Sequence, residues 1–366
     1  MNILDTLVSC SNRFGIDENL VLAGGGNTSA KEGNLMYVKS SGVSLAEIAA
    51  QDFVRMDLAK LQKVFATAYP ADDAAREAAV LADLMDAREA GQENKRPSVE
   101  TPLHALFPQT FVLHIHPALV NGLTCGKGGE TCARQTLQRD FIWVETCKPG
   151  YVLSSLCAER MAEYQAKNGC AADMIVLQNH GIFFAANSEA ELEHMLRAVL
   201  ADLTAAIVRQ PAPQEDTALT DAQENVRQAL LAAYGEPAQA LFCGNADVLG
   251  FCENPAALLE PFTPDHIVYC KAHPLYAQDL ASVPALLAEY IAKHGCRPRV
   301  FLLKGIGAFC FGGNEKQAAT CRALFADAVK VAVYSESFGG PLHMSCDLTD
   351  FIVNWEVESY RVALNK

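Results

Sequence analysis

The chain has 366 residues, a formal net charge of −14 and a hydrophobic content of 50%. This length suits about two domains with ordinary globular cores. An acidic chain without a run of Lys and Arg excludes nucleic acid and anionic membranes as expected partners, although a few local donors can still bind a small anion. No apolar stretch approaches the roughly 20 residues of a membrane-spanning helix. Thirteen scattered cysteines without a C-x-x-C pair, and no basic cluster in Met1–Ser11, predict a cytoplasmic protein with reduced thiols.

The elements expected in the first half alternate between helices and strands, which predicts an α/β fold. Helices are indicated by apolar residues at helical spacing, and strands by short runs rich in Val, Ile and Phe. In chain order we expect a helix over 3–13, a glycine-rich turn over 24–26 that runs into Asn27-Thr28-Ser29, a strand over 35–39, a turn over 40–42, a helix over 71–90, a helix over 100–106, a strand over 111–116, a strand over 173–177 and a helix over 188–209.

A linker is expected at 210–217, which reads Gln-Pro-Ala-Pro-Gln-Glu-Asp-Thr. Two prolines and two acids in eight residues are typical of a domain boundary. The sequence therefore predicts a first domain over 1–209, a linker over 210–217 and a smaller second domain over 218–366.

The second half partly repeats the first. A strand, a glycine turn, a second strand and a capped helix follow one another over 175–189 and again over 300–315. When the two segments are aligned on their glycines, His180 falls opposite Ile306, which cannot bind a metal. We infer a degenerate, repeat-like α/β second domain without the metal ligands, with two unrelated strand–turn–helix units as the alternative.

The strongest local signal for chemistry is His114-Ile115-His116 at the end of an expected strand. Side chains at positions i and i+2 of a strand project from the same face, so two imidazoles can converge on one ion. Pro117 ends the strand directly afterwards. The alternative is a pair of core histidines that serve only as hydrogen-bonding groups.

Two further residues complete a candidate metal site. His180, in Asn179-His180-Gly181, adds a third imidazole at another strand end, and three imidazoles leave the open coordination position of a catalytic zinc site. Glu100 opens the expected helix over 100–106 and is a candidate general acid/base beside the metal. A capping role alone is the alternative for Glu100.

An anion site is indicated by the turn Gly24-Gly25-Gly26, because glycines let backbone N–H groups approach a phosphate closely. Asn27, Thr28 and Lys31 follow this turn and are candidate substrate-binding residues. The turn at Ser41-Gly42 offers a second set of donors. A flexible turn without a ligand is the alternative in both places, and the first turn is neither a P-loop nor a dinucleotide fingerprint.

Five motifs in this order resemble the class II aldolase/adducin family over about residues 1–205. They are Gly-Asn-Thr-Ser at 26–29, Ser-Gly at 41–42, Pro-Ser-x-Glu at 97–100, His-x-His at 114–116 and Asn-His-Gly at 179–181. The second half, with Thr-Pro-Asp-His at 263–266 and Gly-Ile-Gly-Ala-Phe at 305–309, looks like the aldolase part of bifunctional rhamnulose-1-phosphate aldolase/alcohol dehydrogenase proteins. The dehydrogenase part of those proteins has no counterpart in this chain.

The resemblance implies a class II aldolase-like α/β/α sandwich with a mixed, largely antiparallel central sheet. It implies that His114, His116 and His180 bind a divalent metal, with Zn²⁺ favoured over Mn²⁺, Co²⁺ or Fe²⁺, and that Glu100 is the catalytic acid/base. The phosphate-binding residues that it implies are Asn27, Ser41, Gly42 and Ser98.

The family includes L-fuculose-1-phosphate aldolase, so we expect a metal-dependent lyase that splits a ketose 1-phosphate into dihydroxyacetone phosphate and a short aldehyde. The expected partners are a small phosphorylated sugar and further copies of the same chain in a homo-oligomer. Epimerisation or dehydration of a sugar phosphate at the same metal site is one alternative. A non-catalytic, adducin-like binding module is the alternative from another class.

Overall fold

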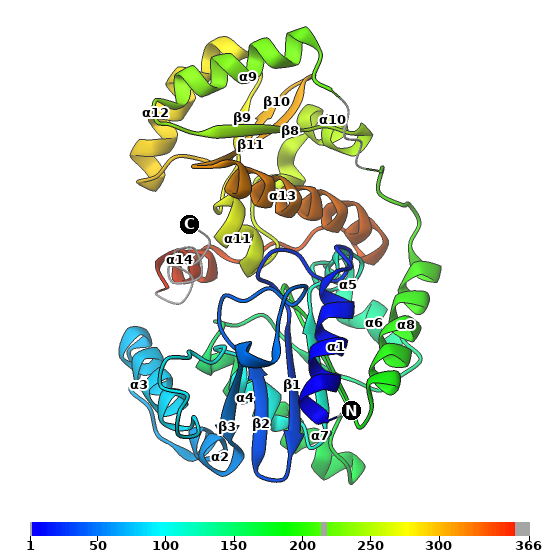
Figure 1. Cartoon of the computed structure of the whole chain (residues 1–366). Coiled ribbons are helices and arrows are strands. Elements are labelled where there is room, and N and C mark those ends of the chain that lie inside the picture. Colours follow the sequence, from blue (N-terminus) through cyan, green and yellow to red (C-terminus); the bar gives the residue numbers. More distant parts are fainter. Residues whose placement is uncertain (1, 214–217, 356–366) are drawn as a thin grey trace. The chain divides into compact units, whose positions relative to one another are not determined.

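The computed structural model describes residues 2–213 and 218–355, which form two compact units (Figure 1). Within these ranges, unit 1 contains 2–120, 130–206 and 355, and unit 2 contains 121–129 and 207–354. The expected linker over 210–217 lies partly outside the described residues, at 214–217. None of the helices described here combines the length and apolarity that a membrane crossing requires.

The core of unit 1 is a seven-stranded sheet in the order β3-β2-β1-β4-β7-β6-β5. Neighbouring strands are antiparallel except β5 and β6, which are parallel. This confirms the expected mixed, largely antiparallel sheet. The central strands β4, β6 and β7 are buried along their whole length, which explains their nearly continuous apolar sequence. The strands are β1 (Asn27–Glu32), β2 (Leu35–Lys39), β3 (Phe53–Asp57), β4 (Phe111–Ile115), β5 (Ile142–Val144), β6 (Met174–Leu177) and β7 (Gly181–Ala186).

Helices cover both faces of this sheet. On one face, α4 and α7 pack on Val112 and Phe183, while α2 and α3 pack on Val38 and Met56. On the other face, α1 lies against β1 and α8 against β7. Unit 1 is therefore an α/β/α sandwich. Its helices are α1 (Ile3–Gly15), α2 (Leu58–Ala66), α3 (Asp73–Asp86), α4 (Thr101–Leu106), α7 (Tyr151–Asn168) and α8 (Glu189–Ala206), with a 3-10 helix, η1 (Ala50–Asp52); α5 (Ala118–Thr124) and α6 (Gly129–Thr136) have residues in both units.

The polar residues after the glycine-rich turn form a strand. The turn ends at Gly26, whose φ is +69°, and Asn27 begins strand β1. Asn and Ser favour turns locally, but Ser29 pairs with Val38 of β2 on one side and Val112 of β4 on the other. Strand pairing therefore overrides the local preference. The side chains of 27–32 consequently alternate between the two faces of the sheet.

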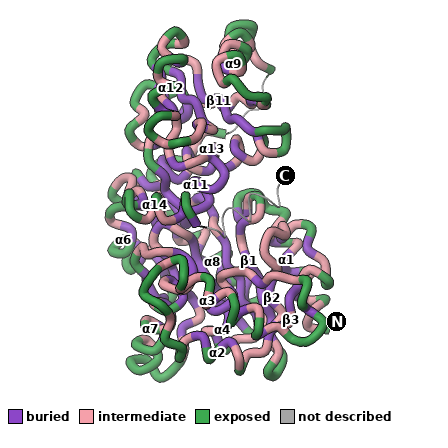
Figure 2. The backbone as a smooth tube through the Cα atoms, turned by 90° about the vertical axis from the view of Figure 1, so that its left-hand side faces the viewer, coloured by how far each residue is buried: buried purple, intermediate pink, exposed green. Residues whose placement is uncertain are grey.

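Unit 2 contains a four-stranded sheet in the order β8-β11-β10-β9. Helices α9 and α12 cover an aromatic face that includes Phe301, Phe309 and Phe311, and α13 covers the other face. Figure 2 shows buried residues along β11 and exposed residues on the outer turns of α9. The elements of this unit are β8 (Gln239–Cys243), β9 (Leu275–Ala277), β10 (Val300–Leu303), β11 (Gly307–Gly312), α9 (Asp221–Tyr234), α10 (Ala246–Glu253), η2 (Pro255–Leu258), α11 (Pro264–Cys270), η3 (Leu280–Ser282), α12 (Val283–His294), α13 (Glu315–Ser335), η4 (Glu336–Phe338) and α14 (Cys346–Asn354).

The four strands of unit 2 have the same topology as four strands of unit 1. Order β8-β11-β10-β9 matches β4-β7-β6-β5, and in each set two antiparallel pairs are followed by one parallel pair. The registers also correspond, because His114 pairs with Phe183 as Phe242 pairs with Phe309. By this correspondence Phe242, Gly244 and Ile306 occupy the positions of the three candidate metal ligands. A Cβ on Gly244 would lie 2.4 Å from the Phe242 ring, so the aromatic side chain fills this place.

Candidate metal centre

His114 and His116 stand at the end of β4, on the sheet face that α4 and α7 cover. Nδ1 of His114 lies 2.9 Å from the carbonyl oxygen of Ile182 on β7, and the ring stacks on Phe183 with centroids 3.9 Å apart. A carbonyl oxygen only accepts, so Nδ1 donates and the lone pair of His114 is on Nε2. Nε2 of His116 lies 2.8 Å from Nε2 of His114. The two rings therefore converge through their Nε2 atoms.

His180 is supplied by the tight turn between β6 and β7. The turn closes through a hydrogen bond from the His180 N–H to the carbonyl oxygen of Leu177, at 3.2 Å. Gly181 follows, and a Cβ at this position would lie 2.6 Å from Cδ2 of His116 and 2.6 Å from the carbonyl oxygen of Ile115. A side chain at this position would therefore displace the His116 ring or the backbone of β4.

Glu100 is placed by the start of α4. Its N–H donates to Oγ of Ser98 at 3.2 Å, and the hydroxyl of Thr101 donates to the Ser98 carbonyl oxygen at 2.6 Å. Pro102, in the first helical turn, lacks the N–H that would have no partner there. These contacts hold the carboxylate with Oε1 3.1 Å from Nε2 of His114 and 3.4 Å from Nε2 of His180.

The four side chains fit a divalent cation. One ligand atom from each of Glu100, His114, His116 and His180 lies within 4.8 Å of the others. Imidazole nitrogen with one carboxylate is a donor set that suits zinc and related transition metals, and three imidazoles leave room for a further ligand. Glu100 can act in this arrangement as a fourth ligand or as a base beside the ion.

The protonation states of the cluster also suit a metal. Burial raises the pKa of Glu100, but the charges and hydrogen bonds of His114 and His180 prevail and hold it well below the ordinary value. Burial lowers the pKa of His180 to about 4, against an opposing hydrogen bond to Glu100. Near neutral pH the carboxylate is charged and His180 is neutral, as metal ligands must be.

Two of the predicted phosphate-binding residues, Asn27 and Ser98, contact Glu100 of this cluster, and the Ser41-Gly42 turn is joined to the segment that leads to Ser98. Nδ2 of Asn27 is 3.4 Å from Oε2 of Glu100, and the buried Oδ1 of Asn27 has no hydrogen-bond partner among the described residues. Ser98 contacts Glu100 directly, as described above. The Ser41 N–H donates to the carbonyl oxygen of Arg96 at 2.9 Å, which joins the Ser41-Gly42 turn to the segment that leads to Ser98.

Thr28 and Lys31 are not brought to this cluster. Thr28 lies on the opposite face of β1, where its hydroxyl is 2.7 Å from Oγ of Ser11 in α1. Lys31 is four residues beyond Asn27, roughly 13 Å along the strand, and its Nζ donates to the carbonyl oxygen of Gln109. Both placements follow from β1 being a strand, since successive side chains of a strand point to opposite faces and spread along its length.

Lys39, the last residue of β2, is a further candidate that was not predicted from the sequence. Its side chain is buried, and Nζ donates to the carbonyl oxygen of Gly24 at 3.4 Å. Its own carbonyl oxygen accepts from the N–H of Ser98. The ammonium group of Lys39 therefore lies between the glycine-rich turn and the segment that contains Ser98. The available signal was a lysine that ends a strand directly before Ser40-Ser41-Gly42.

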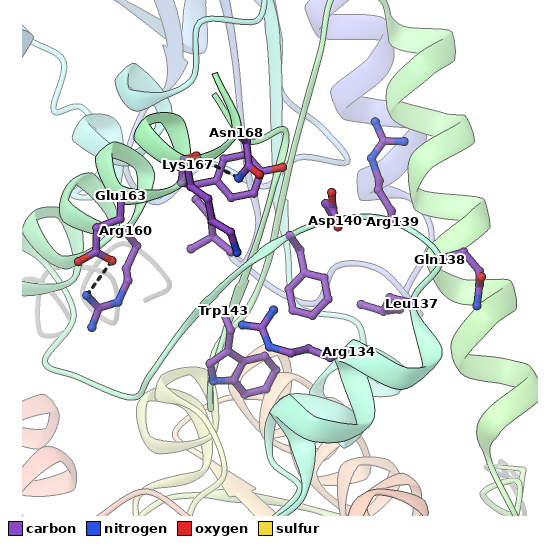
Figure 3. Close-up of a pocket in the computed structure, with 13 residues that line it drawn as sticks. Arg134, Leu137, Gln138, Arg139, Asp140, Trp143, Arg160, Glu163, Lys167 and Asn168 are labelled. Atoms are coloured by element: carbon purple, nitrogen blue, oxygen red, sulfur yellow. Dashed lines mark hydrogen bonds and ion pairs between the residues drawn. The ribbon is translucent and has the colours of Figure 1, made fainter. Parts of the chain in front are cut away.

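A separate cavity of about 610 Å³ lies between α6, the start of β5 and α7 (Figure 3). Because β5 runs parallel to β6, whose far end leads to His180, this cavity is at the opposite end of the sheet from the metal cluster. Arg134 pairs with Glu130 at 2.7 Å and Arg160 with Glu145 at 2.8 Å. These two arginines of the cavity are thus paired with acids, and we assign the cavity no role in the metal centre.

Comparison with known proteins identifies the family. A model of the class II aldolase and adducin N-terminal domain matches residues 5–201, which include all four residues of the cluster. The chain belongs to the class II aldolase and adducin family. The match ends close to the last residue of α8 and so covers the sheet and helices of unit 1.

Individual relatives are distant. The uncharacterized oxidoreductase YuxG of Bacillus subtilis (strain 168) is 24% identical over 412 residues, which cover 99% of this chain and 58% of that protein. The chain therefore spans little more than half the length of this relative. The N-terminal class II aldolase domain of a conserved protein from Thermoplasma acidophilum is 24% identical and covers 55% of this chain and 92% of its own, with a TM-score of 0.48. An L-fuculose 1-phosphate aldolase is 17% identical, with 56% and 84% covered and a TM-score of 0.38.

Proposed function

We propose that this protein is a divalent-metal-dependent aldolase that cleaves a ketose 1-phosphate between C3 and C4, giving dihydroxyacetone phosphate and a short aldehyde. The observation that carries the proposal is the convergence of three Nε2 atoms and one carboxylate from β4, the β6–β7 turn and α4. Membership of the class II aldolase and adducin family supports aldolase-type chemistry at this site.

His114, His116 and His180 hold the cation in this proposal, and Zn²⁺ is the favoured ion because of its preference for imidazole nitrogen. A bound divalent cation supplies electrostatic stabilisation of the negative charge that develops on the C2 and C3 oxygens of the substrate. The hydrogen bond from His114 to Ile182 fixes one ring in the tautomer that binds through Nε2.

Glu100 moves the proton. As a carboxylate it accepts the proton of the C4 hydroxyl, the C3–C4 bond breaks, and the aldehyde leaves. The electron pair of the broken bond remains on the C3 side as an enediolate. Glu100 then returns its proton to C3, which gives dihydroxyacetone phosphate and restores the carboxylate, so atoms and charge balance. A positioned carboxylate of this kind contributes about 10²- to 10⁴-fold to a rate.

The phosphate is assigned to Asn27, Ser41, Gly42 and Ser98, with Lys39 as an added cation. Hydroxyl and amide groups with a backbone N–H at a glycine turn are suitable donors for phosphate oxygens. The unpartnered Oδ1 of Asn27 provides an acceptor for a substrate hydroxyl. Lys39 adds the positive charge that compensates a phosphate on an acidic chain.

The test combines metal analysis with an assay of cleavage. Purified protein is loaded with Zn²⁺, Mn²⁺ or Co²⁺ and incubated with a panel of ketose 1-phosphates, and aldehyde and dihydroxyacetone phosphate are measured. Metal-dependent release of both products supports the proposal. Bound metal with epimer or dehydrated product, and no cleavage, would assign the same site to an epimerase or a dehydratase. No bound metal under any loading condition would favour a non-catalytic, adducin-like binding module.

A further inference from the structure

The turn that carries His180 adopts an unusual backbone conformation. Asn179, directly before His180, has a φ of +56°, the left-handed region that residues with a Cβ rarely enter. Asparagine tolerates this region better than most residues, but glycine does so at lower energy. The Asn179 side chain is also buried. Something other than backbone preference must therefore account for asparagine at this position.

Thr146, two residues beyond β5, contacts this turn at three points. Its hydroxyl donates to Oδ1 of Asn179 at 2.7 Å and lies 3.5 Å from the carbonyl oxygen of Gln178, and its N–H donates to Oε1 of Gln178 at 3.2 Å. A backbone hydrogen bond from the Gln178 N–H to the carbonyl oxygen of Val144 continues the β5–β6 pairing beside them. The residue before the metal ligand is thus fixed through its side chain to the neighbouring strand connection.

Unit 2 provides an internal comparison for this turn. Val144 pairs with Leu177 as Ala277 pairs with Leu303, so Asn179 corresponds to Gly305 and Thr146 to Asp279. The backbone bond is kept, since the Lys304 N–H donates to the carbonyl oxygen of Ala277 at 3.1 Å. Gly305 has a similar φ of +70°.

The side-chain contact is absent from this counterpart. Gly305 has no side chain, and Oδ1 of Asp279 accepts instead from the N–H of Ser282, which caps the following 3-10 helix. The next residue, Ile306, stands where His180 stands in unit 1. The same turn therefore uses glycine where no metal ligand follows, and an asparagine bonded to a threonine where one does.

We propose that Thr146 is a positioning residue for the metal centre. Its hydrogen bond to Asn179 fixes the β6–β7 turn, and through the turn it sets the direction in which the His180 ring presents Nε2. This inference rests on the proposed function only in requiring that the cluster binds a metal. Outer groups that orient a metal ligand commonly change metal affinity by about 10- to 100-fold when they are removed.

The experiment measures metal affinity, so it does not depend on turnover. Zn²⁺ affinity is measured by competition with a chromophoric chelator, and the geometry of the site is followed by the visible absorption of bound Co²⁺. Thr146→Val should weaken Zn²⁺ binding by about tenfold or more and alter the Co²⁺ spectrum. Thr146→Ser keeps the hydroxyl and should restore both.

A matched control is available at the other end of the sheet. Thr110 also donates through its hydroxyl to an asparagine, at 3.4 Å from Oδ1 of Asn187, but contacts no residue of the cluster. Thr110→Val should bind Zn²⁺ as the wild type does. Wild-type Zn²⁺ affinity and an unchanged Co²⁺ spectrum in Thr146→Val would overturn the positioning role.

A second variant separates positioning from folding. Asn179→Gly keeps the left-handed backbone without strain and removes only the side chain that Thr146 contacts. It should fold and lose at least as much Zn²⁺ affinity as Thr146→Val, and the double variant should bind Zn²⁺ no more weakly than Asn179→Gly alone. Wild-type affinity in Asn179→Gly overturns the proposal. Failure of the wild-type protein itself to bind Zn²⁺ or Co²⁺ overturns the proposed function, and the role of Thr146 with it.

Discussion

His114 donates its Nδ1 proton to the carbonyl oxygen of Ile182 across the β4–β7 pair, at 2.9 Å. This backbone contact sets the tautomer of a fully buried imidazole without requiring a second side chain. Because Ile182 lies two residues after His180, the contact also ties the β4 ligands to the turn that supplies the third imidazole. The site is therefore built around the pairing of two central strands.

The first prediction concerns metal content. The wild-type protein should hold about one divalent ion per chain, and His114→Ala should hold almost none, because the remaining ligands cannot close the site. Elemental analysis of dialysed protein measures this. His194→Ala is the control, since His194 lies on α8 outside the cluster and should leave the ion in place. Equal metal content in both variants would refute the assignment of His114.

The second prediction concerns Glu100. Glu100→Gln is nearly isosteric but cannot accept a proton at neutral pH, so turnover should fall by about 10²- to 10⁴-fold. Metal content should be retained through the three histidines. Glu32→Gln, at the exposed end of β1, should keep wild-type turnover. Cleavage at the wild-type rate in Glu100→Gln would show that another group transfers the proton.

The third prediction concerns pH and the stability of the metal-free protein. The pKa of His180 is lowered by burial from the ordinary 6.5 to about 4, so between these values the unfolded chain binds more protons than the folded one. The free energy of unfolding must then rise as the pH increases through this window. The stability gained in this way is lost again as the pH falls through the same window. Glu100, whose pKa is also held low against the effect of burial, acts in the same direction.

Denaturant unfolding of metal-free protein at pH 7 and pH 5 measures this dependence. His180→Gln removes the titrating imidazole and should show a smaller loss of stability between the two pH values. An equal pH dependence in His180→Gln and wild type would mean that His180 does not cause it.

The fourth prediction concerns Gly181. A Cβ at this position would lie 2.6 Å from both the His116 ring and the Ile115 carbonyl oxygen, and one of these is backbone that cannot easily move. Gly181→Ala should lower the free energy of unfolding by about 1–3 kcal/mol and weaken metal binding. Gly250→Ala is the control, because its Cβ would meet no atom within 4 Å and Gly250 lies in helix α10. Thermal unfolding and metal titration of the two variants provide the comparison.

The four residues of the candidate metal site could be proposed from the sequence because two parts of the site are each short, contiguous segments. His114 and His116 are separated by one residue at the end of a strand, and Glu100 directly precedes a helix that Pro97 and Ser98 mark, so each of these two parts has a local signal. His180 could be assigned to the same site only from the ordered set of motifs, because no short-range pattern in the sequence relates the turn after β6 to the end of β4.

The positions of the candidate substrate-binding residues were harder to predict because they depend on pairing between distant strands. Thr28 and Lys31 followed a glycine-rich turn in sequence, but β2 and β4 draw these residues into a strand and separate their side chains. The inclusion of 121–129 in unit 2 was also not foreseen. Its backbone bonds, such as Gly128 N–H to the Phe338 carbonyl oxygen, join segments more than 200 residues apart and leave no local pattern.

The shared strand order has a consequence for how the chain responds to its surroundings. Where unit 1 places His114, unit 2 places Phe242, so one polypeptide holds a version of this core with a candidate ion site and a version filled by an aromatic ring. If the first version binds an ion as proposed, a chelator should weaken it and leave the second unaffected. The stability of unit 1 would then depend on the supply of divalent ions, whereas that of unit 2 would not.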